Sequence, residues 1–562
     1  MSQSNNNENN EKNFLQKIRS LFISTNSGEE TKLAILLGIM FIGIIYIYTI
    51  SRLLKDNLVT ARLGAEVIPL MKNIVAISTF IFSIIFMLGN LAFNRRKLFN
   101  ITVMIFLTFF GIFGFIIYPN SEMYLLSETT ANNILDWLGG ATDEFLSFTK
   151  FIKMSLGGII SGLFVSLTNF KPKKIVKNVT IYSSLIFGIY GILYFLAGPK
   201  LITSKSVILL VELLKYWPYV LYYISSEMVG AFFLSALFWN FANYQVNLSE
   251  AKRVYPFVVL IGQIGQIGAG YMTQFFSSSK HLVAIVSATT LLSGAMILFL
   301  HEYIVINMKR EIEVAPSKKK QKASFFDSLK AMVSSSIVLL TSSIILFYGI
   351  TCNILETYWK DSLNFLSKNL YPLSKEAARA YFSYQQSSMI IWVGYLSVIS
   401  ALLSGWILRT MGWRFSALIT PVTVALGTGL FFGLNLWNDI TGAGGIPILK
   451  IAMIIGMIVL AFVKATKYTI FDNTKEMLLI NLPADIKSQA KVADSLSGRL
   501  GKTLGGQTLL VIQIFLGAFT TLPVKISVFV LMLLCSLIWT FNVYSLATLE
   551  KKAEEEENKK NN

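Results

Sequence analysis

The chain has 562 residues, of which 54% are hydrophobic and only 14% are charged, and its mean hydropathy is +0.59. Because soluble domains carry about 25% charged residues, this composition excludes an ordinary soluble protein and predicts a polytopic, all-α membrane protein. The net charge of +18 is typical of cytoplasmic loops rich in Lys and Arg, so we expect a surrounding lipid bilayer and no nucleic-acid partner. Two cysteines and two histidines predict neither a disulfide framework nor a metal site.

Residues 1–32 begin with a polar, asparagine-rich stretch and are predicted to be a disordered cytoplasmic N-terminus. After them, apolar runs long enough to cross about 30 Å of hydrocarbon recur along the chain, whereas a membrane barrel would show short alternating segments. Twelve spans are predicted, at approximately residues 33–53, 69–93, 100–118, 216–241, 254–276, 282–307, 333–358, 387–409, 415–436, 449–470, 499–518 and 523–547.

Residues 119–198, between the third and fourth spans, hold two further candidate helices, 152–170 and 178–198. The stretch before them is rich in Asp and Glu, and the stretch between them, 171–177, is basic. Basic loops favour the cytoplasmic side, and a single extra span would invert every later loop. We therefore predict an inserted hairpin of two crossing helices; the alternative is that neither helix crosses.

Basic loops follow the second, sixth and eighth spans, and all of them lie on one side if both termini are cytoplasmic. The longest, 309–330, is predicted to link an N-terminal transmembrane half, 33–308, to a C-terminal half, 331–548, and residues 549–562 form a charged cytoplasmic tail. Two six-helix halves joined by such a linker form the major-facilitator-like plan, in which substrate binds near the midplane between the halves. This step is an analogy, because the halves share no strong sequence repeat.

The stretch SLSGRLGKTLGG, residues 495–506, contains Gly501, Lys502 and Thr503, which resemble the end of a phosphate-binding P-loop. That motif needs a further glycine five residues before Gly501, after a strand and before a helix. The position is occupied by Leu496, and the flanks are apolar runs. A soluble P-loop ATPase is therefore disfavoured, and the glycines are expected to form a small-residue packing face at the start of the eleventh span.

Charged side chains within apolar spans cost free energy and usually face a cavity or a partner. Six lie in or at the ends of the predicted spans: Lys72, Glu227, Glu356, Lys464, Lys467 and Lys502. Lys464, Lys467 and Lys502 lie near span ends, from which a lysine can instead extend to the lipid headgroups, and Glu227 could form a structural ion pair between helices. Lysines outnumber carboxylates in this set, which favours an anionic substrate such as phosphate.

Four long blocks of the sequence carry a family pattern: LLKDNLVTARLGAEVIPLMK (53–72), KYWPYVLYYISSEMVGAFFLSALFWNFANYQVNLSEAKRVYPFVVLIGQIG (215–265), NILETYWKDSL (353–363) and KATKYTIFDNTKEMLLINLPADIKSQAKVADSLSGRLGKTLGG (464–506). They resemble the nucleotide transporter, or ATP/ADP translocase, family of plastids and obligate intracellular parasites. The resemblance implies a carrier that imports host ATP against ADP by alternating access, without catalytic residues, metal or cofactor. It also implies the inner or plasma membrane of an intracellular organism, and we expect a monomer.

The resemblance implies transport roles for Lys72, Glu227, Glu356 and Lys502, and further pathway candidates in the same blocks are Lys55, Asn240, Lys467 and Arg499. Lys72 and Lys502 would engage the polyphosphate of the nucleotide. The two glutamates would hold these lysines when the site is empty, or contact the ribose and base.

The sequence departs from the family pattern in two blocks: SEMVG (226–230) replaces its Ala-Glu-Leu-Trp-Gly, and Thr503 and Leu504 replace a serine and a glycine. Proton-coupled or broad uptake of GTP, UTP or NAD on the same fold therefore remains an alternative. A proton-coupled carrier of another solute would use Glu227 as its titrating group. A membrane-bound enzyme would need a nucleophile–base pair or metal cluster, which the sequence lacks, and a structural or receptor protein would not need charges inside both halves.

Overall fold

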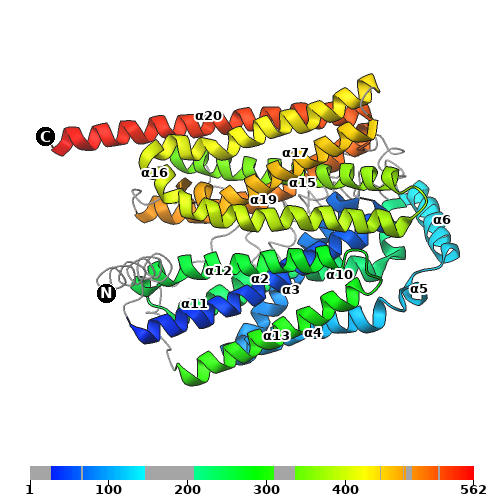
Figure 1. Cartoon of the computed structure of the whole chain (residues 1–562), viewed down its shortest axis with the longest axis horizontal. Helices are drawn as coiled ribbons and strands as arrows, with labels where there is room; N and C mark the ends of the chain where they lie inside the picture. Colours follow the sequence, from blue (N-terminus) through cyan, green and yellow to red (C-terminus); the bar gives the residue numbers. More distant parts are fainter. Residues whose placement is uncertain are drawn as a thin grey trace, which may run out of the picture. The chain divides into compact units, whose positions relative to one another are not determined.

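The computed structural model describes residues 27–64, 67–145, 208–308, 336–442, 445–472, 474–475, 477, 484–516 and 519–561. Almost all of them lie in helices (Figure 1), so the helical class predicted from the composition is confirmed. The predicted hairpin helices at 152–170 and 178–198 and the predicted linker at 309–330 lie outside the described residues, as do residues 1–26. The division into two six-helix halves stays a prediction.

The helices of the N-terminal part correspond to the first six predicted spans. They are α2 (Gly28–Leu63), α3 (Ile68–Ala92), α4 (Arg95–Ile112) with the π-helix η2 (Phe113–Ile117), α10 (Trp217–Val229) with the π-helix η3 (Gly230–Phe238) and α11 (Trp239–Gln245), α12 (Leu248–Phe275) and α13 (Leu282–Asn307). α2 begins before the predicted residue 33 because the Ser27 hydroxyl accepts a hydrogen bond from the Glu30 backbone N–H at 3.1 Å and caps the helix.

The helices of the C-terminal part are α15 (Ser336–Leu370), α16 (Lys375–Thr441), α17 (Gly445–Thr466) with the π-helix η4 (Lys467–Phe471), α19 (Ala484–Leu516) and α20 (Leu522–Asn561). The 67 residues of α16 are two helices joined at Gly412, whose φ of 77° interrupts the helical conformation. Glycine adopts a positive φ at little cost. This break separates the predicted spans 387–409 and 415–436.

Nine helices in the described part of the chain are long and apolar enough to cross a membrane, and a tenth apolar helix, Ile68–Ser83, is shorter. α16 counts once among the nine although it contains two predicted spans. α19, which holds the predicted span at 499–518, is described only as far as Leu516 and is not among them. The many apolar helices agree with a polytopic membrane protein.

The chain divides into two compact units. The first consists of Met1–Asn120, Leu221–Leu509 and Phe519–Asn562, and the second consists of Ser121–Val220 and Leu510–Ala518. In the second unit the Trp217 indole donates a hydrogen bond to the Tyr124 carbonyl at 2.7 Å, and the Leu126 backbone N–H donates to the Lys215 carbonyl at 3.3 Å. Residues 124–126 and 215–217, which lie far apart in the sequence, therefore contact each other.

Helices α15 and α19 approach closely through glycines. A Cβ atom added at Gly501 would lie 2.5 Å from the Leu346 carbonyl oxygen and 3.1 Å from the Gly349 Cα, and one at Gly505 would lie 3.0 Å from the Ile350 carbonyl oxygen. Only residues without a side chain allow two helix backbones to come this near. The expected small-residue packing face is thereby confirmed at Gly501 and Gly505.

Candidate functional site

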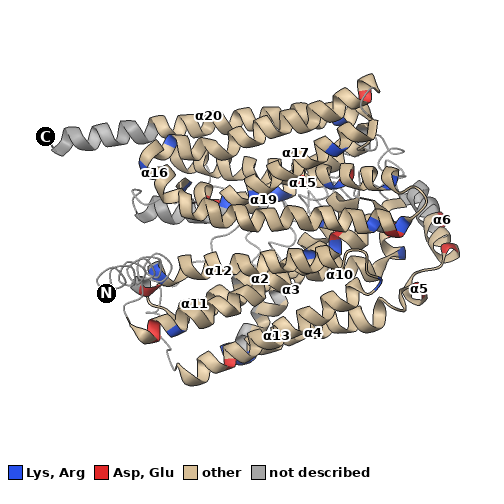
Figure 2. Cartoon of the chain, viewed as in Figure 1, with Lys and Arg blue, Asp and Glu red and all other residues tan. Residues whose placement is uncertain are grey.

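Charged residues are sparse along the helices (Figure 2), but α2 carries three of them close together. Arg52 precedes Lys55 and Asp56 by three and four residues, so it shares one face of the helix with each of them. The Lys55 and Asp56 side chains are only 2% and 4% exposed, and Lys55 Nζ lies 2.7 Å from Asp56 Oδ1. Arg52 donates a hydrogen bond to the Tyr48 hydroxyl at 2.7 Å.

Glu227, on α10, is the second carboxylate that Lys55 contacts. Lys55 Nζ lies 2.9 Å from Glu227 Oε1, and Arg52 Nε lies 3.5 Å from the same oxygen. The Lys55 ammonium also lies 3.7 Å from the ring centroid of Tyr223, one turn before Glu227, which adds a cation–π interaction. The Arg52 and Glu227 side chains are 33% and 26% exposed, so the protein encloses this end of the arrangement less fully than it encloses Lys55 and Asp56.

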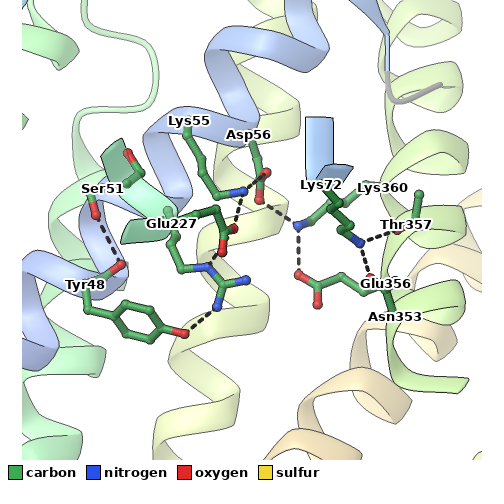
Figure 3. Close-up of polar contacts among 12 residues, drawn as sticks. Tyr48, Ser51, Lys55, Asp56, Lys72, Glu227, Asn353, Glu356, Thr357 and Lys360 are labelled. Atoms are coloured by element: carbon green, nitrogen blue, oxygen red, sulfur yellow. Dashed lines mark hydrogen bonds and ion pairs between the residues drawn. The ribbon is translucent and has the colours of Figure 1, made fainter. Parts of the chain in front are cut away.

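One face of α15 supplies the polar groups on the other side of Asp56 (Figure 3). Asn353, Glu356, Thr357 and Lys360 recur at spacings of three and four residues, which places them on a single helical stripe. Lys360 Nζ lies 2.7 Å from Glu356 Oε1. The other oxygen of Glu356, Oε2, lies 2.9 Å from Lys464 Nζ at the end of α17.

Asp56 and Lys360 join α2 directly to α15. Lys360 Nζ lies 2.6 Å from Asp56 Oδ2, and the Gln386 amide of α16 donates to the same oxygen at 2.9 Å. The Lys360 side chain is 6% exposed. Lys360 therefore contacts Asp56 and Glu356 together, and it connects the α2 ion pairs to those of α15.

Lys72, on α3, is held by neutral groups. Its ammonium donates hydrogen bonds to the Asn353 side-chain oxygen and, at 3.2 Å, to the Thr357 hydroxyl. The Asn353 amide in turn donates to the backbone carbonyl of Lys502 at 2.7 Å. Asn353 thus links Lys72 to the start of the Gly-Lys stretch on α19.

Lys502 has an exposed side chain, and among the described residues its ammonium forms no hydrogen bond or ion pair. The part of the chain that the structure describes also places no carboxylate within ion-pair distance of Lys72. Among the described residues, Glu227 and Glu356 therefore do not hold Lys72 and Lys502, the first of the two roles expected of them. The alternative role, contact with the ribose and base, stays a prediction. Each glutamate contacts a cation that lies closer to it, because Lys55 and Lys360 reach the carboxylates from neighbouring turns and helices.

We call the assembled groups the charge cluster. It consists of the cations Arg52, Lys55, Lys72, Lys360 and Lys464 and the carboxylates Asp56, Glu227 and Glu356. Five cations accompany three carboxylates, so positive charge is in excess by two. Lysine and arginine bind phosphate oxygens through charge-assisted hydrogen bonds, and a partly desolvated setting strengthens such contacts. The arrangement is therefore suited to a polyanionic substrate.

The candidate residues predicted from the sequence fall into three groups. Lys72, Glu227, Glu356 and Lys55 lie in the charge cluster, and Lys502 is connected to it through its backbone. Lys467 Nζ instead lies 3.3 Å from Asp472 Oδ2, and Asn240 is exposed at a separate cavity of about 90 Å³. The side chain of Arg499 lies outside the described residues.

Five members of the arrangement were missed as site residues: Arg52, Asp56, Lys360, Asn353 and Lys464. Lys360 follows Glu356 by one helical turn, and Asp56 follows Lys55 directly, so a signal was present in both blocks. The sequence shows Lys464 near a span end, from which its side chain could extend to the lipid headgroups. In the structure it forms an ion pair with Glu356 instead.

Sequence comparison with known proteins identifies the family of this chain. The profile described as "TLC ATP/ADP transporter" matches residues 8–168 and 179–550, which includes most of the predicted insertion. "ADP,ATP carrier protein 3" of Rickettsia felis is 28% identical over 95% of this chain and 97% of its own length. "ADP,ATP carrier protein 1, chloroplastic" of Arabidopsis thaliana is 28% identical over 84% of this chain and 66% of its own length.

Two solved structures of transporters were also compared. The nucleoside transporter NupG (D323A mutant) gives a TM-score of 0.43 at 14% identity, and a bacterial homologue of the iron transporter ferroportin gives 0.45 at 11%. Each comparison covers 92% of this chain and 99% of the other. Scores of this size do not decide the fold, so family membership rests on the sequence. The family profile spans nearly the whole chain, and this protein belongs to the TLC ATP/ADP transporter family.

Proposed function

We propose that this protein exchanges ATP for ADP across a membrane by alternating access, and that the charge cluster is where the nucleotide phosphates bind. The observation that carries the proposal is the excess of positive charge among partly buried helical residues. Such an excess is costly unless an anion compensates it. Membership of a transporter family agrees with the sequence analysis, which found no nucleophile–base pair or metal cluster for a membrane-bound enzyme.

Lys72 and Lys502 are the primary phosphate-binding groups in this proposal. Neither has a carboxylate partner among the described residues, so a phosphate oxygen gains their full attraction without displacing a resident anion. Asn353 connects α3 to α19, because its side chain accepts a hydrogen bond from the Lys72 ammonium and donates one to the Lys502 backbone carbonyl. A nucleotide that contacts both lysines would therefore act on α3 and α19 together.

The cellular setting is part of the same proposal. Relatives in Rickettsia species carry the name ADP,ATP carrier protein, and these support a place in the plasma membrane of an intracellular organism, where host ATP would enter against ADP. We further propose that both termini are cytoplasmic and that one copy of the chain suffices for transport.

Uptake of labelled ATP into intact cells expressing the protein tests the proposal. Lys502→Ala should abolish most ATP uptake while the protein still inserts in the membrane. Lys280→Ala is the matched control, because Lys280 is an exposed lysine in the turn between α12 and α13. Uptake that is unchanged in Lys502→Ala would exclude a phosphate-binding role for this residue.

The substrate and the mode of transport need a second measurement. Parallel uptake of labelled ATP, GTP, UTP and NAD identifies the preferred nucleotide. Vesicles preloaded with ADP are then compared with empty vesicles. Exchange predicts rapid ATP uptake only into the preloaded vesicles, whereas a proton symporter would fill the empty ones and lose uptake with an uncoupler.

A further inference from the structure

Asp56 is the most deeply enclosed carboxylate of the charge cluster, and both of its oxygens are occupied. Oδ1 accepts from Lys55 at 2.7 Å, and Oδ2 accepts from Lys360 at 2.6 Å and from Gln386 at 2.9 Å. The side chain is 4% exposed. Two ammonium groups and one amide therefore surround a single carboxylate, much as they would surround a phosphate group.

The contacts of Asp56 connect helices that are far apart in the sequence. Asp56 lies on α2, Lys360 on α15 and Gln386 on α16. Figure 3 shows the Asp56 carboxylate between the Lys55 and Lys360 ammonium groups. α2 and α15 also belong to the N-terminal and C-terminal halves that the sequence predicts. An alternating-access movement that separates these helices has to break the Asp56–Lys360 ion pair.

We propose that Asp56 is the internal counter-anion of the empty carrier: it occupies Lys55 and Lys360, holds α2 against α15, and is replaced by a nucleotide phosphate in the step that lets these helices separate. This inference rests on the proposed nucleotide exchange. It concerns a residue to which the family resemblance gives no role, and it assigns Asp56 to the coupling of transport rather than to substrate contact.

The physical basis is the cost of an unpaired buried charge. Separation of α2 from α15 without substrate would leave Lys360 and Asp56 each short of a buried partner, which is strongly unfavourable. A phosphate that replaces Asp56 at Lys360 gives Lys360 a new anionic partner, and Asp56 keeps its contact with Lys55 on the same helix. The same movement then no longer costs Lys360 one of its two carboxylate contacts. The empty carrier therefore crosses slowly and the loaded carrier crosses quickly, which is the condition for obligate exchange.

The test uses full-length protein in proteoliposomes loaded with labelled ADP. Efflux is measured with and without external ATP, and the ratio of the two rates reports how strictly exchange is coupled. Asp56→Asn keeps the shape of the side chain but removes its charge. We expect its efflux without external ATP to rise about tenfold or more over the wild type, which lowers the ratio.

Further variants separate the charge from the contacts. Lys360→Gln removes the cation of the same ion pair and should raise ADP efflux without external ATP by the same factor. The double variant Asp56→Asn/Lys360→Gln should show no more of this efflux than either single variant. Gln386→Ala removes only an uncharged hydrogen-bond donor to Asp56 and should raise ADP efflux without external ATP much less. Asp439→Asn, which removes an ion pair with Lys525 outside the cluster, should leave the ratio unchanged.

Two results would overturn the inference. One is an Asp56→Asn protein with the wild-type ratio. The other is an Asp56→Asn protein that binds ADP but loses both fluxes, since Asp56 would then be needed for movement of the loaded carrier. If Asp56→Asn does not fold, Lys360→Gln decides by the same criteria. Absence of any ATP-stimulated efflux in the wild type would instead contradict the proposed exchange function itself.

Discussion

Among the described residues, only neutral oxygens accept the hydrogen bonds of the Lys72 ammonium, and no carboxylate there forms an ion pair with it. Asn353 and Thr357 supply these oxygens, whereas Lys55 and Lys360 each contact two carboxylates. A phosphate that binds Lys72 displaces a neutral group and no anion. The free energy of that contact is therefore available to substrate binding rather than spent on breaking an ion pair.

Replacement of Lys72 by glutamine should raise the KM for ADP by about tenfold or more. A hydrogen bond to a charged group contributes about 1.5–3 kcal/mol, and about 1.4 kcal/mol corresponds to a factor of ten. Initial exchange rates over a range of ADP concentrations give KM and the maximal rate separately. Lys280→Gln serves as the exposed-lysine control, and an unaltered KM in Lys72→Gln would argue against phosphate contact by Lys72.

The sequence predicted those cluster residues whose charge stands alone in an apolar run. Lys72, Glu227, Glu356 and Lys464 were found in this way, and the family blocks added Lys55. Asp56 and Lys360 escaped because each lies beside an opposite charge in the sequence, a pattern that is also typical of a solvated helix end. Their contact joins α2 to α15, and such long-range contacts leave no periodic signal along the chain.

At the scale of the helices, the glycine contact between α15 and α19 makes a sharp prediction about stability. Gly501→Ala places a Cβ atom against the backbone carbonyl of Leu346, which cannot move aside like a side chain, so the helices must separate. Overpacking of this kind costs about 1–3 kcal/mol. Gly498→Ala is the control on the same helix, because its Cβ would meet only Ile345 Cγ2 at 3.8 Å.

The thermal unfolding temperature of the purified protein in detergent measures this difference. Gly501→Ala should melt several degrees below Gly498→Ala, and Gly498→Ala should stay near the wild type or rise, since alanine favours the helix over glycine. Equal melting temperatures for the two variants would show that the close approach of the helices is not required for stability.

Helix positions were largely predictable from the sequence, but helix boundaries were not. The two spans that flank Gly412 were separated correctly, because basic residues and a glycine interrupt the apolar pattern there. The π-helices η3 and η4 had no signal, although η3 follows Glu227 by three residues and η4 begins three residues after Lys464. Wider helical turns depend on packing between helices rather than on residue spacing, and they are frequent at functional sites.

For the whole molecule, the distribution of basic loops predicts which turns face the cytoplasm. In a Cys352→Ala/Cys535→Ala background, Lys280→Cys and Leu373→Cys should react with a membrane-impermeant maleimide on intact cells, whereas Arg409→Cys should react only after permeabilisation. All three positions are exposed, so a lack of labelling reports the side of the membrane. The reverse pattern would invert the predicted topology and place both termini outside.

The two positive charges in excess within the cluster also give the carrier an electrical property. A charge that crosses the full membrane field changes in energy by about 2.3 kcal/mol per 100 mV, and alternating access exposes the same cluster first to one side and then to the other. An inside-negative potential therefore draws the cationic empty site towards the cytoplasm. A bound nucleotide cancels or reverses this charge, so the voltage acts less strongly, or in the opposite direction, on the loaded carrier.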